Sequence, residues 1–233
     1  MPASAKWIEA DAYVFDIDGT LLNAYGGAHY NAFHSALKKH FNLGCKIDGV
    51  PLHGNTDTGI LRAVLAREGV PAGEFDAKRN AVFEQMCAAV EANREHVRTE
   101  LCPGIVPLLE ELERRKKLLG LATGNLERIG WIKVEAARVR KYFSFGAFSD
   151  GHETREDIFR DAVRQVHARL GTEARTCFVG DTPHDVTAAR AIGAPVIAVA
   201  TGIFSCEQLQ EHEPDVCLTN CEGLLAHIPS ARA

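Results

Sequence analysis

The feature that most constrains this chain is an apolar run that ends abruptly in two acidic residues. Residues 13–20 read Tyr-Val-Phe-Asp-Ile-Asp-Gly-Thr. A short apolar run with β-branched and aromatic residues predicts a buried strand. Alternate residues of an extended chain point to the same side, so Asp16 and Asp18 can converge on one ligand. Gly19 lets the backbone bend sharply directly after them.

The composition and charge of the chain narrow the class of protein. Of the 233 residues, 46% are hydrophobic and 24% are charged, which is typical of a globular protein. The formal net charge of −5 argues against a nucleic-acid partner, because such proteins usually carry a basic face. Residues 1–7 are too short and polar for a signal peptide, and no apolar run approaches the length of a membrane span. We therefore predict a cytoplasmic monomer or homodimer with no membrane partner.

The cysteines are odd in number and scattered, which predicts reduced thiols, as expected in the cytosol. A structural zinc site needs four ligands, and the closely spaced pair near the C-terminus has no second Cys or His pair nearby. The seven residues are Cys45, Cys87, Cys102, Cys177, Cys206, Cys217 and Cys221.

Residues 24–100 differ from the rest because they carry helical patterns without a convincing strand. One pattern runs over about 26–39, a second begins with Thr56 as its N-cap, and a third covers about 75–95. An insertion after the first strand must lie over the carboxyl end of the sheet, where ligands bind in parallel α/β folds. We therefore predict an all-helical domain over 24–100 that acts as a lid. The alternative is a helical bundle that only enlarges the core.

Strand and helix patterns alternate from residue 103 to the C-terminus. This alternation predicts an α/β fold in which a parallel sheet is covered by helices on both faces. We expect residues 1–23 and 101–233 to form this core. The predicted strands after the first are 118–122, 143–148, 176–179, 196–200 and 216–218.

Three of the predicted strands end in short polar motifs. If these strands are parallel and adjacent, their carboxyl ends meet in one crevice and bring several carboxylates together. Clustered carboxylates repel one another unless a cation compensates them, and oxygen ligands suit Mg²⁺. The sequence therefore predicts a Mg²⁺ site. The motifs are Asp16-Ile-Asp18-Gly-Thr, Thr123-Gly124-Asn125 and Gly-Asp181-Thr-Pro-His-Asp185.

These motifs together resemble those of the haloacid dehalogenase superfamily, in particular phosphatases with a helical cap of the C1 type. The resemblance covers nearly the whole chain and implies a Rossmann-like core. It implies that Asp16 attacks phosphorus to form an aspartyl-phosphate and that Asp18 acts as acid and then as base. It also implies that Mg²⁺ is held by the Asp16 carboxylate, the Asp18 carbonyl and Asp181, with Asp185 in a supporting role. The implied phosphate ligands, at a helix N-terminus, are Thr123, Gly124 and Asn125.

One residue of the family pattern is replaced in this chain. The family usually supplies a Lys from the loop after the third strand, but no Lys occurs after Lys141. Arg155 stands at the start of the next predicted helix and carries the same charge, so we predict that it is the phosphate-side cation and a catalytic residue. The alternatives are that Arg155 is solvated, or that Lys133 or Lys141 reaches the site.

The resemblance implies a Mg²⁺-dependent phosphomonoester hydrolase acting on a small phosphorylated metabolite. Asp18 favours phosphoryl transfer over carbon–halogen cleavage, because an oxygen leaving group must be protonated. His53 and Asn55, and with them Asp57, are candidates for contact with the leaving group, although a His next to Gly is also common in turns. Three alternatives stay open: a sugar-phosphate mutase, a phosphonate hydrolase, which needs a cap Lys, and a non-catalytic binding module.

Overall fold

The structure is a computed structural model that describes residues 7, 9–44 and 46–227, so the predictions for Cys45 and residues 1–6 lie outside the described residues. Its core is one parallel sheet of six strands, in the order β5-β4-β1-β6-β7-β8. The strands are β1 (Ala12–Phe15), β4 (Leu118–Ala122), β5 (Phe145–Ala147), β6 (Thr176–Gly180), β7 (Val196–Val199) and β8 (Val216–Leu218).

The central position of β1 explains its continuous apolar sequence. Its last residue, Phe15, is paired with Leu121 of β4 on one side and with Val179 of β6 on the other. Every residue of β1 is buried, because helices cover both faces of the sheet. The predicted adjacency of the three motif-bearing strands is therefore confirmed.

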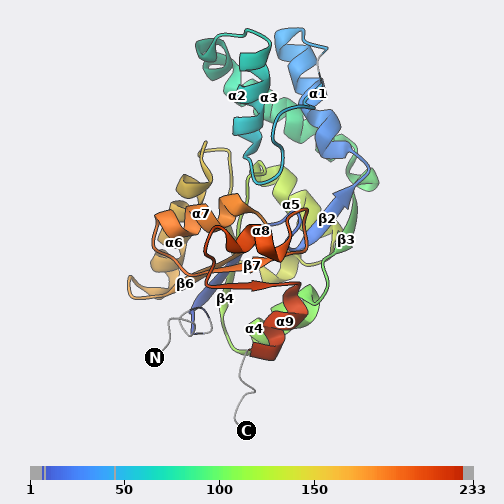
Figure 1. Ribbon diagram of the computed structural model, residues 1–233. Coiled ribbons are helices and arrows are strands. Elements are labelled where there is room, and N and C mark those ends of the chain that lie inside the picture. The colour runs from blue at the N-terminus through green and yellow to red at the C-terminus, as the bar shows by residue number, and fades with distance from the viewer. Residues whose placement is uncertain (1–6, 8, 45, 228–233) are drawn as a thin grey trace.

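Two layers of helices cover the sheet, as Figure 1 shows, and this confirms the predicted α/β class. Tyr13 and Phe15 pack in the same hydrophobic cluster as residues of α4 (Ile105–Arg114), α5 (Glu127–Ala136) and α9 (Cys221–His227). Ala12 and Val14, which point to the opposite face, pack with α6 (Arg155–Leu170), α7 (Pro183–Ala191) and α8 (Cys206–Gln210). Two short 3₁₀ turns are η2 (Arg94–His96) and η3 (Arg140–Tyr142).

The segment inserted after β1 carries three helices that stand beyond the carboxyl end of the sheet (Figure 1). They are α1 (Ala28–Phe41), α2 (Asp57–Arg67) and α3 (Ala72–Ala92). Thr56 is the N-cap of α2, as predicted, and its hydroxyl accepts a hydrogen bond of 2.9 Å from the Gly59 amide. The three helices share their own apolar cluster, which also includes Leu126 and Ile129 near the start of α5. The lid therefore packs on the helix that follows the second motif.

A two-stranded antiparallel ribbon joins this segment to the core, and the sequence patterns did not predict it. It consists of β2 (Leu22–Tyr25) and β3 (Arg98–Leu101). Both strands are short, rich in polar residues and partly exposed, so they lack the apolar alternation that marks a strand. The predicted domain boundaries fall inside this ribbon, and the division of the chain at these points stays a prediction.

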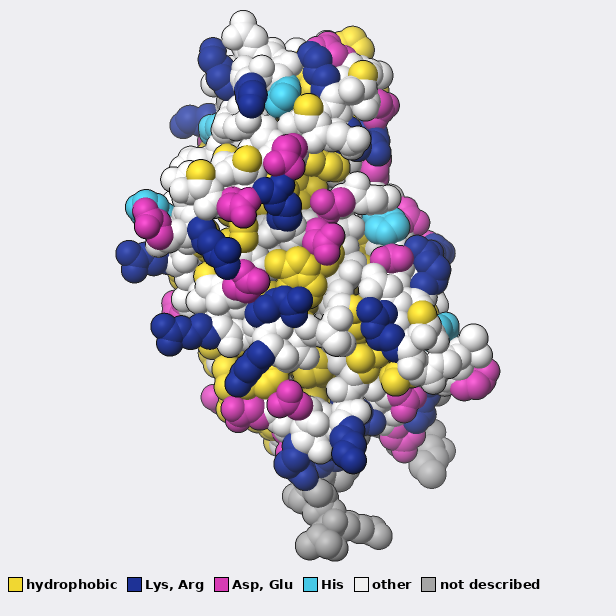
Figure 2. All heavy atoms as spheres, turned by 180° about the vertical axis from the view of Figure 1, so that it is seen from behind, with side chains coloured by type: hydrophobic (Ala, Val, Ile, Leu, Met, Phe, Trp, Pro, Cys, Tyr) yellow, Lys and Arg dark blue, Asp and Glu magenta, His cyan; other side chains and the backbone are white. Residues whose placement is uncertain are grey.

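The remaining features concern the surface and the thiols. Acidic and basic side chains are intermixed over the face shown in Figure 2, where no large area carries a single sign. None of the helices in the described part of the chain has the length and apolar character needed to cross a bilayer. The described cysteines are free thiols, and the sulfur atoms of Cys206 and Cys217 lie 2.7 Å apart.

Candidate active site

The first acidic motif, residues 16–20, forms a tight turn at the carboxyl end of β1. The Asp16 amide continues the sheet by donating to the Val179 carbonyl at 2.9 Å, so its side chain is fixed at the strand end. Gly19 adopts φ +84°, and a Cβ at this position would lie 2.2 Å from a carboxylate oxygen of Asp181. A glycine is therefore required here for two reasons, the positive φ and the close approach of Asp181.

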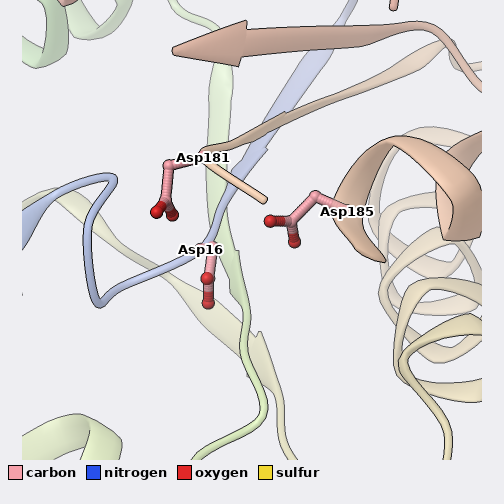
Figure 3. A group of neighbouring side chains, drawn as sticks. All are labelled: Asp16, Asp181 and Asp185. Atoms are coloured by element: carbon pink, nitrogen blue, oxygen red, sulfur yellow. The ribbon is translucent and has the colours of Figure 1, made fainter. Parts of the chain in front are cut away.

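Three carboxylates converge at this edge of the sheet. Figure 3 shows Asp16 after β1, Asp181 after β6 and Asp185 in the first turn of α7, with the three side chains grouped at this edge of the sheet. Their ligand atoms all lie within 4.8 Å, and all three residues are buried. The predicted acidic cluster is thus present in the structure.

The electrostatics of this cluster suit a bound cation. Burial, together with the charges of Asp185 and Asp18, raises the pKa of Asp16 to about 6 despite the opposing charge of Arg155. Burial and the neighbouring Asp16 also raise the pKa of Asp181 well above its usual value. Among the described residues, none donates a hydrogen bond to the buried Oδ1 atom of Asp16. A donor set made only of carboxylate oxygens, with one oxygen unpartnered, fits Mg²⁺.

Asp185 and Asp181 are each held by neighbours. Asp185 Oδ2 accepts hydrogen bonds from the Thr182 amide at 3.0 Å and the Thr182 hydroxyl at 2.7 Å, as part of the capping box of α7. Its Oδ1 atom accepts from Arg155 at 2.7 Å. The Thr20 hydroxyl donates to Asp181 Oδ1 at 2.8 Å. Because both oxygens of Asp185 are engaged, its geometry agrees with a supporting role better than with direct ligation.

Arg155 lies against the Asp16 carboxylate. It is the first residue of α6, which Thr154 caps, and it is only 8% exposed. Its guanidinium donates to Asp16 Oδ2 at 3.3 Å, to Asp185 Oδ1 at 2.7 Å and to the Gly54 carbonyl at 3.2 Å. The alternative of a solvated Arg155 is therefore wrong, and its role as the phosphate-side cation stays a prediction.

The Asp18 carboxylate is held apart from this triad. Its Oδ2 atom accepts from Lys133 Nζ at 2.6 Å and from Asn125 Nδ2 at 2.8 Å. Burial raises the pKa of Asp18, but the charge of Lys133 and these two hydrogen bonds outweigh it, so the pKa lies below its usual value. Asp18 is therefore poised as an anion at the edge of the cavity.

Lys133 is a site residue that the sequence analysis considered only as a substitute for Arg155. It lies on α5, is 4% exposed, and donates to Asn125 Oδ1 at 2.7 Å as well as to Asp18. Both cations are thus present at the site, whereas Lys141 is exposed. The burial of Lys133 could have been predicted from the sequence, because Lys133 follows Ile129 by four residues and so lies on the same buried face of the helix.

The second motif forms the loop between β4 and α5. Thr123 is buried, and its hydroxyl accepts a hydrogen bond of 2.7 Å from the Asn125 side chain. The Gly124 carbonyl accepts from the Asp57 amide at 2.8 Å, and a Cβ on Gly124 would lie 2.3 Å from the Asn55 carbonyl oxygen. All three motif residues line the cavity described below, and their role as phosphate ligands stays a prediction.

The loop before α2 contributes the candidate specificity residues. His53 is exposed and Asn55 is partly buried, and both line the cavity. The Asn55 amide is used within its own loop, since Nδ2 donates to the Pro51 carbonyl at 3.2 Å and Oδ1 accepts from the Thr56 amide at 2.8 Å. Contact of either residue with substrate remains untested.

Asp57 anchors the lid to the core. Its Oδ2 atom accepts from the Leu126 amide at 2.8 Å, at the start of α5, and lies 3.1 Å from His29 Nε2. This carboxylate belongs to α2 and binds the amide that precedes α5, so it joins the inserted segment to the core. Asp57 also lines the cavity, and its contact with substrate stays a prediction.

These elements enclose a cavity of about 290 Å³ between the strand ends and the lid. Asp16, Asp18 and Asp181 line its floor together with Lys133 and Arg155, and residues of α1, α2 and α3 line its other side. The structure thus brings a buried acidic cluster, two cationic side chains and a cavity together in one place.

Comparison with protein families identifies the group to which this architecture belongs. Residues 13–199 match the family described as haloacid dehalogenase-like hydrolase. The chain belongs to this family. The predicted resemblance is confirmed, and the predicted class of enzyme, a haloacid dehalogenase-like phosphatase, agrees with the relatives described next.

Several curated relatives are phosphoglycolate phosphatases. The protein from Photorhabdus laumondii is 24% identical over 222 residues, covering 93% of this chain and 92% of that protein. The protein from Pseudomonas aeruginosa is 28% identical over 220 residues, covering 91% and 77%. The match to the protein from Mesorhizobium japonicum, 25% over 126 residues, covers 54% of this chain and 55% of that protein.

A solved structure shares the fold over almost the full chain. The structure of CbbY from Rhodobacter sphaeroides in complex with phosphate matches with a TM-score of 0.67 and 22% identity, covering 92% of this chain and 96% of that chain. This likeness supports the architecture described above.

Proposed function

We propose that this protein is a Mg²⁺-dependent phosphomonoester hydrolase that uses Asp16 as its nucleophile. The observation that carries the proposal is the state of the Asp16 carboxylate. One of its oxygens is buried without a hydrogen-bond donor among the described residues, and the other faces Arg155 at the floor of the cavity. An unpartnered carboxylate oxygen beside an acidic cluster fits a group that binds a cation and attacks an electrophile.

The roles of the site residues follow from their positions. The Asp16 carboxylate and Asp181 would hold Mg²⁺ together with the Asp18 carbonyl, and Asp185 would fix Arg155 and the turn that carries Asp181. When bound, Mg²⁺ supplies positive charge that offsets repulsion between the carboxylates and the phosphoryl group. Arg155 would add a second positive charge beside the nucleophile.

Bond formation takes place at Asp16, and proton transfer takes place at Asp18. Asp16 attacks phosphorus and the ester oxygen departs, which leaves an aspartyl-phosphate on Asp16. Asp18 lies two residues along the same strand end. In the reactive complex it carries one proton, taken up when the ester binds, and it delivers this proton to the leaving oxygen and becomes an anion. It then removes a proton from the water that cleaves the intermediate, and its low pKa suits this second step. The Thr123 hydroxyl and the amides that follow it would hold phosphoryl oxygens.

The direct experiment measures phosphate release from p-nitrophenyl phosphate with Mg²⁺ and with a chelator. We expect hydrolysis only with the metal and none with Asp16→Asn. Glu173→Gln changes an exposed carboxylate that does not line the cavity, so it serves as the control and should keep wild-type activity. Turnover without a divalent metal, or an active Asp16→Asn variant, would contradict the mechanism, and silence on a broad panel of phosphate esters would favour a non-catalytic module.

The remaining alternatives differ in measurable outcomes. A phosphonate hydrolase needs a lysine in the cap, but within the described part of residues 24–100 no lysine lines the cavity. A mutase would isomerise a sugar 1-phosphate without net release of phosphate, so product analysis with a sugar 1-phosphate as substrate separates it from a hydrolase. The names of the relatives make 2-phosphoglycolate a candidate substrate for the hydrolase.

A further inference from the structure

The cavity has two chemically different ends. The floor, at the carboxyl ends of β1, β4 and β6, carries the charged groups that would act on phosphate. The opposite wall comes from the lid and from the segments that lead into and out of it. Because the phosphoryl group must lie against Asp16, the leaving group of a bound ester has to occupy the space along this wall.

The wall of the leaving-group space is apolar. Four of its side chains are buried and two are partly exposed, and they belong to the hydrophobic cluster of the lid. The two tyrosines beside them direct their hydroxyls outward, Tyr25 to Glu100 at 3.2 Å and Tyr30 to Asp48 at 2.8 Å. The apolar side chains are Phe33, Ile47, Leu52, Ile60, Val90 and Val97.

The two cationic side chains that line this cavity, Arg155 and Lys133, are already paired with carboxylates. Arg155 is bound to Asp16 and Asp185, and Lys133 is bound to Asp18. His29 lies 3.1 Å from Asp57. Over the described residues of the lid segment, no Lys or Arg lines the cavity.

A carboxylate on the leaving group would therefore weaken the binding of the ester in this cavity. It would lose water against an apolar wall, with no free guanidinium or ammonium beside it and with Asp18 and Asp57 close by. His53 is the remaining titratable group from the lid, and it lies at the exposed rim, where solvent weakens any ion pair. An uncharged apolar group would instead be stabilised by burial along the same wall.

We infer that the substrates of this enzyme are phosphate monoesters whose leaving group is uncharged and apolar, of the size of a benzyl or short alkyl alcohol. The inference rests on the proposed function and narrows it, since it sets this chain apart from its phosphoglycolate-cleaving relatives. The cavity of about 290 Å³ lies just below the range for ligand sites, about 300 to 1,000 Å³, which agrees with a small leaving group.

Three esters of alkyl alcohols test the inference on the unaltered enzyme. They are benzyl phosphate, 2-phosphoglycolate and the methyl ester of 2-phosphoglycolate. The last two differ in the charge of the leaving group and have leaving oxygens of similar reactivity. We expect kcat/KM for the methyl ester and for benzyl phosphate to exceed that for 2-phosphoglycolate by about 10-fold or more. Equal or faster cleavage of 2-phosphoglycolate overturns the inference.

A variant that supplies the missing cation tests the physical cause. Leu52→Lys places an ammonium on the cavity wall from a loop, at a partly exposed position where a folded variant is expected. It should raise kcat/KM for 2-phosphoglycolate relative to benzyl phosphate by about 10-fold. Leu43→Lys is the matched control, because Leu43 is also partly buried against the lid cluster but does not line the cavity. An unchanged substrate ratio in folded Leu52→Lys, or the same change in Leu43→Lys, overturns the inference.

Failure of this inference is distinct from failure of the proposed function. The function is tested by Mg²⁺-dependent hydrolysis of p-nitrophenyl phosphate and its loss in Asp16→Asn. The leaving-group preference is tested by the ratio between charged and neutral esters in an enzyme that passes that first test. An active, Mg²⁺-dependent enzyme that prefers 2-phosphoglycolate would keep the function and refute the inference.

Discussion

Replacing the nucleophile should abolish catalysis and at the same time stabilise the metal-free protein. Asp16 is 4% exposed and lies within 4.8 Å of the carboxylates of Asp181 and Asp185. Burial and neighbouring negative charge raise its pKa from 3.8 to about 6 in the folded state. A carboxyl group whose folded pKa is raised contributes stability that is fully present below the unfolded pKa. That contribution is lost as the pH rises through the folded value.

The size of the effect follows from this shift. A difference of about 2 pKa units corresponds to about 3 kcal/mol of unfolding free energy, which the ionised side chain costs the metal-free protein at about pH 7. Asparagine has a similar shape and carries no charge at any pH. Asp16→Asn should therefore raise the free energy of unfolding by up to about 3 kcal/mol at about pH 7 and by little at about pH 4.

Urea denaturation in the presence of a chelator measures this difference. The wild type, Asp16→Asn and the exposed control Glu173→Gln are compared at about pH 4 and about pH 7. Mg²⁺ should then stabilise the wild type more than Asp16→Asn, because the ion binds the ionised carboxylate. The reasoning is refuted if Asp16→Asn is less stable than the wild type at about pH 7 without metal, or if its gain does not depend on pH.

Three further substitutions test individual contacts. Arg155→Met should lower kcat/KM for p-nitrophenyl phosphate by about 100-fold or more, because a preorganised positive charge beside Asp16 is lost; near wild-type turnover of this variant would show that Arg155 is not the phosphate-side cation. Lys133→Met frees Asp18 from its ion pair and should lower kcat by about 10-fold with little change in KM, and an effect on KM alone would contradict this role. Gly202→Ala would place a methyl group 1.9 Å from Asp181 Oδ2, so the Mg²⁺ concentration for half-maximal activity should rise by about 10-fold or more; an unchanged Mg²⁺ dependence would count against Asp181 as a ligand.

Much of the core could be predicted because its signals are local. Continuous apolar runs marked the buried strands, and β4 and β8 coincide with the predicted residues 118–122 and 216–218. Thr56 was recognisable as an N-cap from its place before an apolar helical stripe. The ribbon formed by β2 and β3 was missed because its stability comes from pairing between distant segments and not from an apolar pattern within either one.

Part of the candidate site could likewise be predicted from the sequence, and part depended on the tertiary structure. The sequence by itself determined which chemical groups stand at the strand ends, because the order of motifs along parallel strands fixes the edge at which they meet. Only the tertiary structure decided how those groups are paired. It paired Arg155 with Asp16 and Asp185, paired Lys133 with Asp18, and joined Asp57 to the Leu126 amide at the start of α5.

The apolar wall of the cavity shows most clearly what the sequence alone does not determine. In the sequence, Phe33, Ile60 and Val90 are ordinary members of three helical stripes, and nothing in their spacing separates core from cavity. The chain determined that a helical lid would stand over an acidic strand end. Which side chains of that lid face the ligand, and which charges remain free to meet it, depends on how the helices pack, and packing is a property of the folded molecule alone.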